Sequence, residues 1–347
     1  MLRTGVFAAL LLAIAATGLS AAATEDADLA PTKDEQKWLL PKTVPSPEDN
    51  RPTPERIALG KELFFDPRLS SEANLSCAGC HNPMFGWSDG LPTAKGAKSK
   101  VLGRATPTII NTGYNTLMMW DGRKKSLEDQ AMGPMESMNE MAMDLTALFK
   151  WLDSDPTYKA QFAKAYPGEA IDSKTVSKAI ASFERTVVSD DSPFDRWLRG
   201  DKHALTRQQI IGFRLFTDPN KGNCAACHQA PNFTDGGFHN IGLASYDGAT
   251  PDVGRFAIKP LPSMKGAFKT PTLRDVTLTA PYFHDGSAKT LADAMAHYNR
   301  GGDAKADLSP NIKPLNLTAE EQAAIVAFMQ GLTSPHKPVE LPVLPLN

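Results

Sequence analysis

The sequence has no excess of charge of either sign. Its 347 residues include 37 basic and 39 acidic side chains, and the formal net charge is −2. It has no basic block of the kind that holds a chain to an anionic membrane surface. Electrostatics therefore gives no support for a nucleic-acid partner. The length predicts about two domains.

The sequence also lacks an internal hydrophobic run long enough to cross a membrane. An apolar stretch, residues 6–19, follows Arg3 and precedes Ala21, Ala22 and Ala23, and no later segment is apolar enough to span. A bilayer span needs about 20 apolar residues, whereas this shorter pattern is typical of a cleaved signal peptide. We therefore predict a signal peptide over residues 1–23, with an uncleaved anchor as the alternative. The mature protein is expected in the periplasm, without membrane insertion.

Cysteine is scarce, with four in the chain. Outside the cytoplasm four cysteines would usually form two disulfides, but these lie in Cys77-Ala78-Gly79-Cys80-His81 and Cys224-Ala225-Ala226-Cys227-His228. In each motif two thiols can bond the vinyl groups of a haem, and the adjacent histidine can bind its iron. A zinc site or a redox dithiol is the alternative, but a zinc site would leave both histidines unexplained. We predict two haem c groups with His81 and His228 as iron ligands.

The two haem motifs belong to a duplicated unit. A proline, an aspartate and a leucine follow each motif with the same spacing, 14 residues and then 6: Pro107, Asp121 and Leu127 in the first copy, and Pro271, Asp285 and Leu291 in the second. We therefore predict an N-terminal haem domain over residues 50–190 and a C-terminal haem domain over 191–335, with the linker near 189–193. The proline-rich residues 336–347 are expected to form an extended tail.

Strand signals are sparse, and helical periodicity is clear. Apolar residues recur at three and four positions in residues 54–65, 145–165, 173–187, 206–216, 291–298 and 318–332. Thr318 and Glu321 predict a capping box at the start of the last helix. The predicted fold is mainly α, with little strand and with long loops packed on two haem groups.

The two copies differ at a position that matters for iron chemistry. Tyr298 lies 13 residues after Asp285, and Pro134 lies 13 residues after Asp121. A phenol can ligate iron and favours its oxidised form, whereas proline has no ligating side chain. The second haem would then be closed, with Met295 or His297 as alternative ligands, and the first would be open.

An open ferric haem binds peroxide, and cleavage of the O–O bond needs a group that moves a proton between the two oxygens. Gln130 and Glu140 are polar residues near Pro134 and are candidates for this role. The alternative for Glu140 is a solvated helix carboxylate.

At these residues the chain resembles the bacterial di-haem cytochrome c peroxidase family, which includes the MauG proteins. The resemblance covers nearly the whole mature chain. It rests on both haem motifs and on residues 65–70, 120–123, 133–134, 140–141 and 279–286. It implies two cytochrome c-like domains, a peroxide-reactive haem on His81 and an electron-transfer haem on His228.

The resemblance also assigns roles around the first haem. It implies that Trp120 lies between the two haems and relays electrons. It places Gln130, Pro134 and Glu140 in the distal pocket, with Glu140 as the acid and base. Without the resemblance, Trp120 would be interpreted as a core residue.

Two features make the chain MauG-like within this family. Tyr298 stands where ordinary members have methionine, and residues 82–104 contain no histidine that would cap the first haem. Two features depart from the pattern. Gly222 stands where MauG has a surface tryptophan that draws electrons from its protein substrate. Ala105 stands where the family has an asparagine that binds calcium. A calcium ion here would lose that ligand and would retain the carbonyls of Thr279 and Pro281 as ligands.

The function predicted from these residues is peroxide-dependent oxidation of a redox-protein donor, through a high-valent iron intermediate. The donor would be a small periplasmic cytochrome or a copper protein. A MauG-like oxidase that modifies side chains of a partner protein is the alternative. A non-catalytic electron carrier is the alternative from another class, and it would need Met84, Met118 or Met119 as a further ligand of the first iron.

Three other histidines have no predicted role in the chemistry. His239 is expected to be structural, in the loops beside the second haem. His203 and His336 are expected on the surface.

Overall fold

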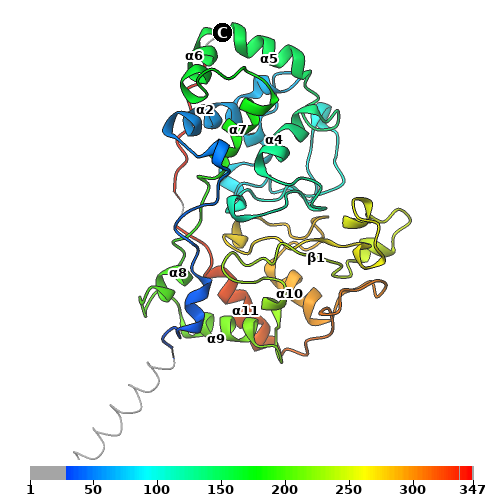
Figure 1. Cartoon of the computed structure of the whole chain (residues 1–347). Helices are drawn as coiled ribbons and strands as arrows, with labels where there is room; N and C mark the ends of the chain where they lie inside the picture. The colour runs from blue at the N-terminus through cyan, green and yellow to red at the C-terminus, as the bar shows by residue number, and fades with distance from the viewer. Residues whose placement is uncertain (1–28, 336, 346–347) are drawn as a thin grey trace, which may run out of the picture.

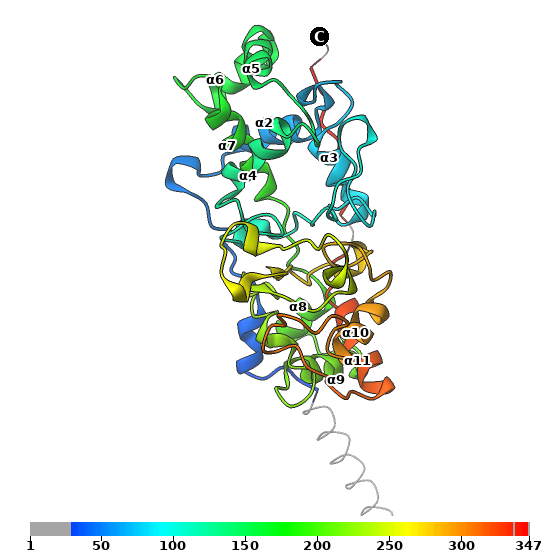
Figure 2. The same cartoon turned by 90° about the vertical axis from the view of Figure 1, so that its right-hand side faces the viewer.

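The computed structural model describes residues 29–335 and 337–345. The predicted signal peptide, His336 and the last two residues of the predicted tail lie outside the described residues. Figure 1 shows two lobes stacked end to end, and Figure 2 shows the same division from the side. No helix of the described residues is both long and apolar enough to cross a membrane.

The first lobe contains helices α2 (Pro54–Phe65), α3 (Cys77–Cys80), α4 (Leu127–Glu136), α5 (Leu145–Ser154), α6 (Pro156–Ala165) and α7 (Ser173–Glu184). The second contains α8 (Pro193–Leu198), α9 (Arg207–Thr217), α10 (Leu291–Asn299) and α11 (Ala319–Gln330). The strands β1 (Phe238–His239) and β2 (Phe268–Lys269) form an antiparallel pair of two residues each. The mainly helical prediction is confirmed.

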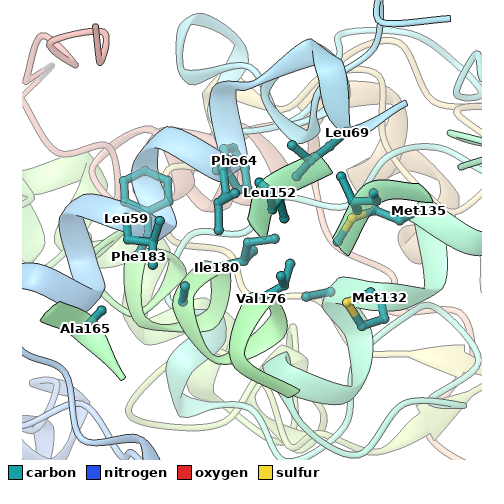
Figure 3. Close-up of a cluster of buried hydrophobic side chains, with 14 of the residues drawn as sticks. Leu59, Phe64, Leu69, Met132, Met135, Leu152, Ala165, Val176, Ile180 and Phe183 are labelled. Carbon is teal, nitrogen blue, oxygen red and sulfur yellow. The ribbon is translucent and has the colours of Figure 1, made fainter. Parts of the chain in front are cut away.

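The first lobe is built around α2 and α7. Thr53 caps α2 by accepting a hydrogen bond from the Arg56 amide, and Pro54 fits the first turn, where no donor is needed. Figure 3 shows Leu59, Phe64 and Ile180 within the buried cluster between these helices. Burial of each such side chain stabilises the fold by roughly 1.5–3 kcal/mol.

The second lobe repeats this arrangement with α9 and α11. A Cβ atom added at Gly60 would lie 1.9 Å from the carbonyl oxygen of Ala179, and one added at Gly212 would lie 1.9 Å from that of Ala324. Each glycine thus lets a helix backbone approach its partner closely, at matching positions of the two copies. The predicted capping box of Thr318 and Glu321 is present at α11.

Each lobe has its own hydrophobic core. The first core runs from Leu59 to Val187, and the second takes its buried residues from Phe194 onward, together with Trp38. The boundary at residue 190 stays a prediction, which this separation of the cores supports. The linker is held in place, because the Ser189 amide and carbonyl both bond the Asn111 side chain.

The two ends of the described chain cross between the lobes. Trp38, in the 3₁₀ helix η1 (Asp34–Trp38), packs on Phe233 of the second lobe with ring centroids 4.5 Å apart. Residues 337–345 contain no helix or strand and run back along the first lobe, where Arg68 donates a hydrogen bond to the Pro345 carbonyl at 2.9 Å.

One predicted helix is wrong. Residues 145–165 form α5 and α6, separated at Asp155. The Asp155 carboxylate accepts hydrogen bonds from the amides of Thr157 and Tyr158, which caps α6, and Pro156 cannot continue α5 because it has no amide proton. Helix α4 was not predicted, because Pro134 lies within it.

Candidate haem sites

The first haem motif holds its histidine in a defined orientation. Cys77 and Cys80 begin and end the single turn of α3, and His81 follows it. The His81 Nδ1 atom lies 3.2 Å from the carbonyl oxygen of Trp87. Burial lowers the pKa of His81, so the imidazole is neutral. A neutral ring with Nδ1 bonded to a carbonyl leaves Nε2 free to bind an iron.

The second motif repeats this geometry. Cys224 begins the 3₁₀ helix η7 (Cys224–Ala226), and the His228 Nδ1 atom lies 2.9 Å from the Phe233 carbonyl oxygen. Burial lowers the pKa of His228 as well. Trp87 and Phe233, which supply the two carbonyls, both have left-handed backbones, with φ of 61° and 55°. Such backbones are uncommon for bulky residues, so the matching strain indicates a shared requirement for these carbonyls.

The cysteines are arranged for thioether bonds rather than for the alternatives. All four lie within the described residues, and all are free thiols. Burial raises the pKa of Cys77 and of Cys224 to about 12, which disfavours a thiolate. Among the described residues, one group of side chains is close enough to share a metal, and it contains Cys227 as its single cysteine. The cysteines therefore do not converge on a four-thiolate zinc site.

A cavity of about 520 Å³ lies beside the first motif. Its walls include His81 and the predicted residues Trp120, Gln130, Pro134 and Glu140. The structure thus brings together in one place all the residues predicted around the first haem.

Within this cavity, Gln130 and Glu140 are held in different ways. Gln130 Nε2 lies 3.9 Å from the sulfur of Met119. The Glu140 backbone is fixed on both sides, because its carbonyl accepts a hydrogen bond from the Ala97 amide at 2.7 Å and its amide donates to the Ser137 carbonyl at 2.9 Å. The Glu140 side chain is half-buried at the cavity wall.

A second cavity of about 240 Å³ lies beside the second motif, and Tyr298 and Met295 of α10 line it. Burial raises the pKa of the Tyr298 phenol above its ordinary value. His297 is engaged elsewhere, since Nδ1 lies 3.2 Å from an Asp303 carboxylate oxygen and Nε2 lies 2.9 Å from the Ile241 carbonyl. With both nitrogens bonded, His297 is a poor iron ligand, and Tyr298 and Met295 remain.

Trp120 lines both cavities. Its indole N–H donates to the Ala105 carbonyl at 2.8 Å, which fixes the ring. The structure therefore places Trp120 at the boundary of the two predicted haem sites.

The remaining candidate methionines and histidines differ in whether they line a cavity or are exposed to solvent. Met84 is 70% exposed and does not line the first cavity, whereas Met118 and Met119 do. His203 is exposed. His239 lines the second cavity and bonds Asp235 at 2.8 Å, and this carboxylate raises the pKa of the imidazole to about 10.

Glu184 and Lys269 are two of the charged residues that line these cavities and were not predicted. Glu184 of α7 lines the first cavity, and its Oε2 atom has no hydrogen-bond partner. Lys269 of β2 lines both cavities. No local pattern marks either residue, because its burial is decided by segments distant in the sequence.

The chain was compared with known proteins. Residues 54–203 match the family model described as di-haem cytochrome c peroxidase, and residues 210–333 match that of cytochrome c. The chain is 42% identical to the methylamine utilization protein MauG of Methylorubrum extorquens, over 96% of this chain and 94% of that protein. It is 38% identical to the cytochrome c551 peroxidase of Pseudomonas aeruginosa, over 83% and 82%.

The chain belongs to the di-haem cytochrome c peroxidase and MauG family. A solved structure agrees: a MauG-like protein associated with microbial copper homeostasis is 32% identical, with a TM-score of 0.79, over 86% of this chain and 95% of that one.

Membership in this family defines the chemistry at a coarse level. The chain is a hydrogen-peroxide-dependent oxidoreductase with two haem c groups, and the family is typically periplasmic. The two cysteine pairs, the two oriented histidines and the two cavities fit these groups, one in each lobe.

Proposed function

We propose that the chain is a periplasmic peroxidase that reduces hydrogen peroxide at the His81 haem and takes electrons from a redox protein through the His228 haem. The observation that supports this most is the asymmetry of the two cavities. Tyr298 and Met295 offer ligands in the second, whereas the matching wall of the first carries Pro134. A haem bound at His81 would thus be open to a small ligand, and a haem bound at His228 would be closed by Tyr298.

Two side chains of the first cavity have different proposed roles in cleavage of the O–O bond. Bound haem supplies an iron that coordinates peroxide and accepts its oxidising equivalents. The Glu140 carboxylate takes the proton from the near oxygen of peroxide and delivers it to the far oxygen, which leaves as water. Gln130 offers an amide donor to the bound peroxide. Reduction of one peroxide to two waters consumes two electrons and two protons.

Trp120 is the proposed route for the electrons. Its ring lines both cavities, and its N–H donates a hydrogen bond to the Ala105 carbonyl that holds the ring in this position. Electrons from the donor would enter at the His228 haem and pass through Trp120 to the first. The donor is a small periplasmic cytochrome or a copper protein.

A MauG-like oxidase acting on side chains of a partner protein is the second candidate. The 42% identity to a MauG protein and the position of Tyr298 favour it. Gly222 argues against electron transfer through a surface tryptophan at position 222. A Cβ atom there would lie 2.7 Å from the Leu215 carbonyl oxygen, so this backbone has no room for a side chain at that position. If the chain modifies a protein, the electrons would leave that protein by another residue.

Calcium at the carbonyls of Thr279 and Pro281 stays a prediction. Both residues line the second cavity, beside Ala105, whose carbonyl accepts the Trp120 hydrogen bond and whose side chain has no oxygen. Treatment with a chelator should change the spectrum of the haems if calcium is bound, and readdition of calcium should restore it. A spectrum indifferent to both steps would exclude the ion.

The proposed function is tested by EPR and optical spectra of the ferric protein, before and after peroxide addition. We expect one high-spin and one low-spin haem, with peroxide consumed in the presence of a reduced cytochrome. Two low-spin haems that do not react with peroxide would support the electron carrier, with Met118 or Met119 on the first iron. In a second step, Tyr298→Phe should convert the low-spin signal to high-spin, and an unchanged signal would assign closure to Met295.

A further inference from the structure

Lys269 is a half-buried cation at the boundary of the two cavities. It ends the strand β2, and its amide donates to the carbonyl of Trp120 at 2.8 Å. This bond places Lys269 directly beside the residue that separates the haem sites. Of the described residues, Lys269 is the one basic side chain that lines both cavities.

The ammonium group of Lys269 has no carboxylate partner among the described residues. Its hydrogen bond goes to the carbonyl of Thr270 at 3.2 Å. The nearby Asp235 already accepts hydrogen bonds from His239 and from the Gly237 amide. Burial lowers the pKa of Lys269 to about 8, and Asp235 opposes this only in part. A buried ammonium is costly unless an anion compensates it.

The other cations of the cavities have their own compensation. Arg104 and Arg123 line the first cavity, and both are paired with Asp121. Lys95 lines the first cavity alone and Lys313 the second alone, and both are exposed to solvent. Lys269 is therefore a half-buried cation that lines both cavities and has no ion-pair partner among the described residues.

Haem c brings the missing anions, because each porphyrin carries two propionate groups. We propose that Lys269 is a positioning residue that pairs with a propionate of each haem, so that one ammonium links the two cofactors beside Trp120. A cation shared in this way stabilises an added electron on either iron. It would raise both reduction potentials together. This inference rests on the two haem groups and holds whether the chain is a peroxidase or an electron carrier.

The test is spectroelectrochemistry of the haem-loaded protein without peroxide. In Lys269→Met, the affinity of each haem for an electron should fall by about tenfold, which is about 59 mV for a one-electron couple. The propionate bending modes of both haems in resonance Raman spectra should shift. Lys95→Met and Lys313→Met are matched controls that remove an exposed cation lining one cavity, and solvent should screen their effect to much less than tenfold.

Lys269→Arg distinguishes charge from packing. It keeps the cation, so both potentials should stay close to those of the parent protein. Unchanged potentials in Lys269→Met, or a change confined to one haem, would overturn the shared contact. Equal losses in the methionine and arginine variants would also overturn it, because they would assign the effect to shape rather than charge. Haem content, measured on each variant, ensures that potentials are compared between fully loaded proteins.

Discussion

Two glutamates line the first haem cavity in different electrostatic surroundings. Glu140 is half-buried on a loop, and no described residue forms a hydrogen bond with its carboxylate. Glu184 is 4% exposed within α7, and burial raises its pKa to about 8. The Glu140 carboxylate is therefore open to contact with a ligand in the cavity, whereas burial favours the neutral form of Glu184 at pH 7.

Replacement of Glu140 tests its role in proton transfer. Glu140→Gln should slow the reaction of the first haem with peroxide by about 10²-fold or more, because an amide cannot accept and return the proton. The rate is measured by rapid mixing of the ferric protein with peroxide. Glu136→Gln is the matched control, since Glu136 is exposed and does not line the cavity. An unchanged rate in Glu140→Gln would remove this residue from the mechanism.

The raised pKa of Glu184 predicts a pH-dependent stability. An unfolded glutamate titrates near about 4.3, and the folded one titrates at about 8. The folded state therefore holds the Glu184 proton more tightly than the unfolded state does. The resulting contribution to the free energy of unfolding is fully present below the unfolded pKa. It is lost as the pH rises toward 8, by up to about 1.4 kcal/mol per pH unit.

Glu184→Gln replaces the neutral acid by a group that does not titrate. Relative to the parent protein, this variant should gain stability steadily from pH 5 to pH 8 and then level off. Urea unfolding of the haem-loaded protein at several pH values measures the difference. Parallel stability curves for the two proteins would show that Glu184 does not carry the proton.

Among individual residues, the sequence predicted those whose chemical role is indicated by a short local motif. The haem motifs are complete in five residues each, Glu140 was a candidate from its place near Pro134, and the family resemblance added the role of Trp120. Glu184 and Lys269 could not be predicted in this way, because both are charged residues of a type that is usually exposed. Their burial depends on helices and loops that meet only in the folded chain.

Among the elements, periodicity located helices well and their ends less well. The range 54–65 was predicted as it stands in α2, whereas 145–165 merged α5 with α6. The apolar pattern continues across Asp155 and Pro156, so the break is marked by the cap and not by the periodicity. Helix α4 was missed for the opposite reason, because Pro134 argues against a helix that tertiary packing nevertheless stabilises.

The close contacts of Gly60 and Gly212 predict matching effects of substitution in the two lobes. Gly60→Ala and Gly212→Ala should each lower the free energy of unfolding by about 1–3 kcal/mol, because the added methyl group meets a backbone carbonyl. In an isolated helix, alanine is more favourable than glycine by about 1 kcal/mol. A loss of stability in these variants would therefore come from the close helix contact and not from helix propensity. Chemical denaturation of the haem-loaded variants gives the values.

Gly79→Ala is the control for this pair. Its Cβ atom would find no neighbour nearer than 4.0 Å, and the second haem motif already carries Ala226 at the equivalent position. We expect no loss of stability there. A neutral result for Gly60→Ala or Gly212→Ala would mean that the helices separate at little cost.

At the scale of the whole molecule, the duplication was predictable from matched spacings, but the connections between the lobes were not. Trp38 and the segment 337–345 carry no repeat signal, yet one joins the second core and the other returns to the first lobe. These segments tie the ends of the chain across the two copies. Between the lobes, the two cavities adjoin at Trp120.

That adjacency predicts that the two haems respond to peroxide as a unit only while Trp120 is present. Trp120→Phe keeps an aromatic ring but removes the indole, its hydrogen bond to Ala105 and its low-energy route for an electron. We expect peroxide still to react at the first haem, while the optical change at the second haem slows by more than about tenfold, as for a step that has lost at least about 1.4 kcal/mol of stabilisation. Rapid mixing with peroxide, followed at wavelengths that separate the two haems, measures both rates.

Trp151→Phe is the matched control, because Trp151 lies in α5 of the first core and lines neither cavity. If the second haem of Trp120→Phe responds as fast as that of the parent protein, electrons cross between the lobes by another path. Electron transfer between the two different haem sites would then not depend on Trp120.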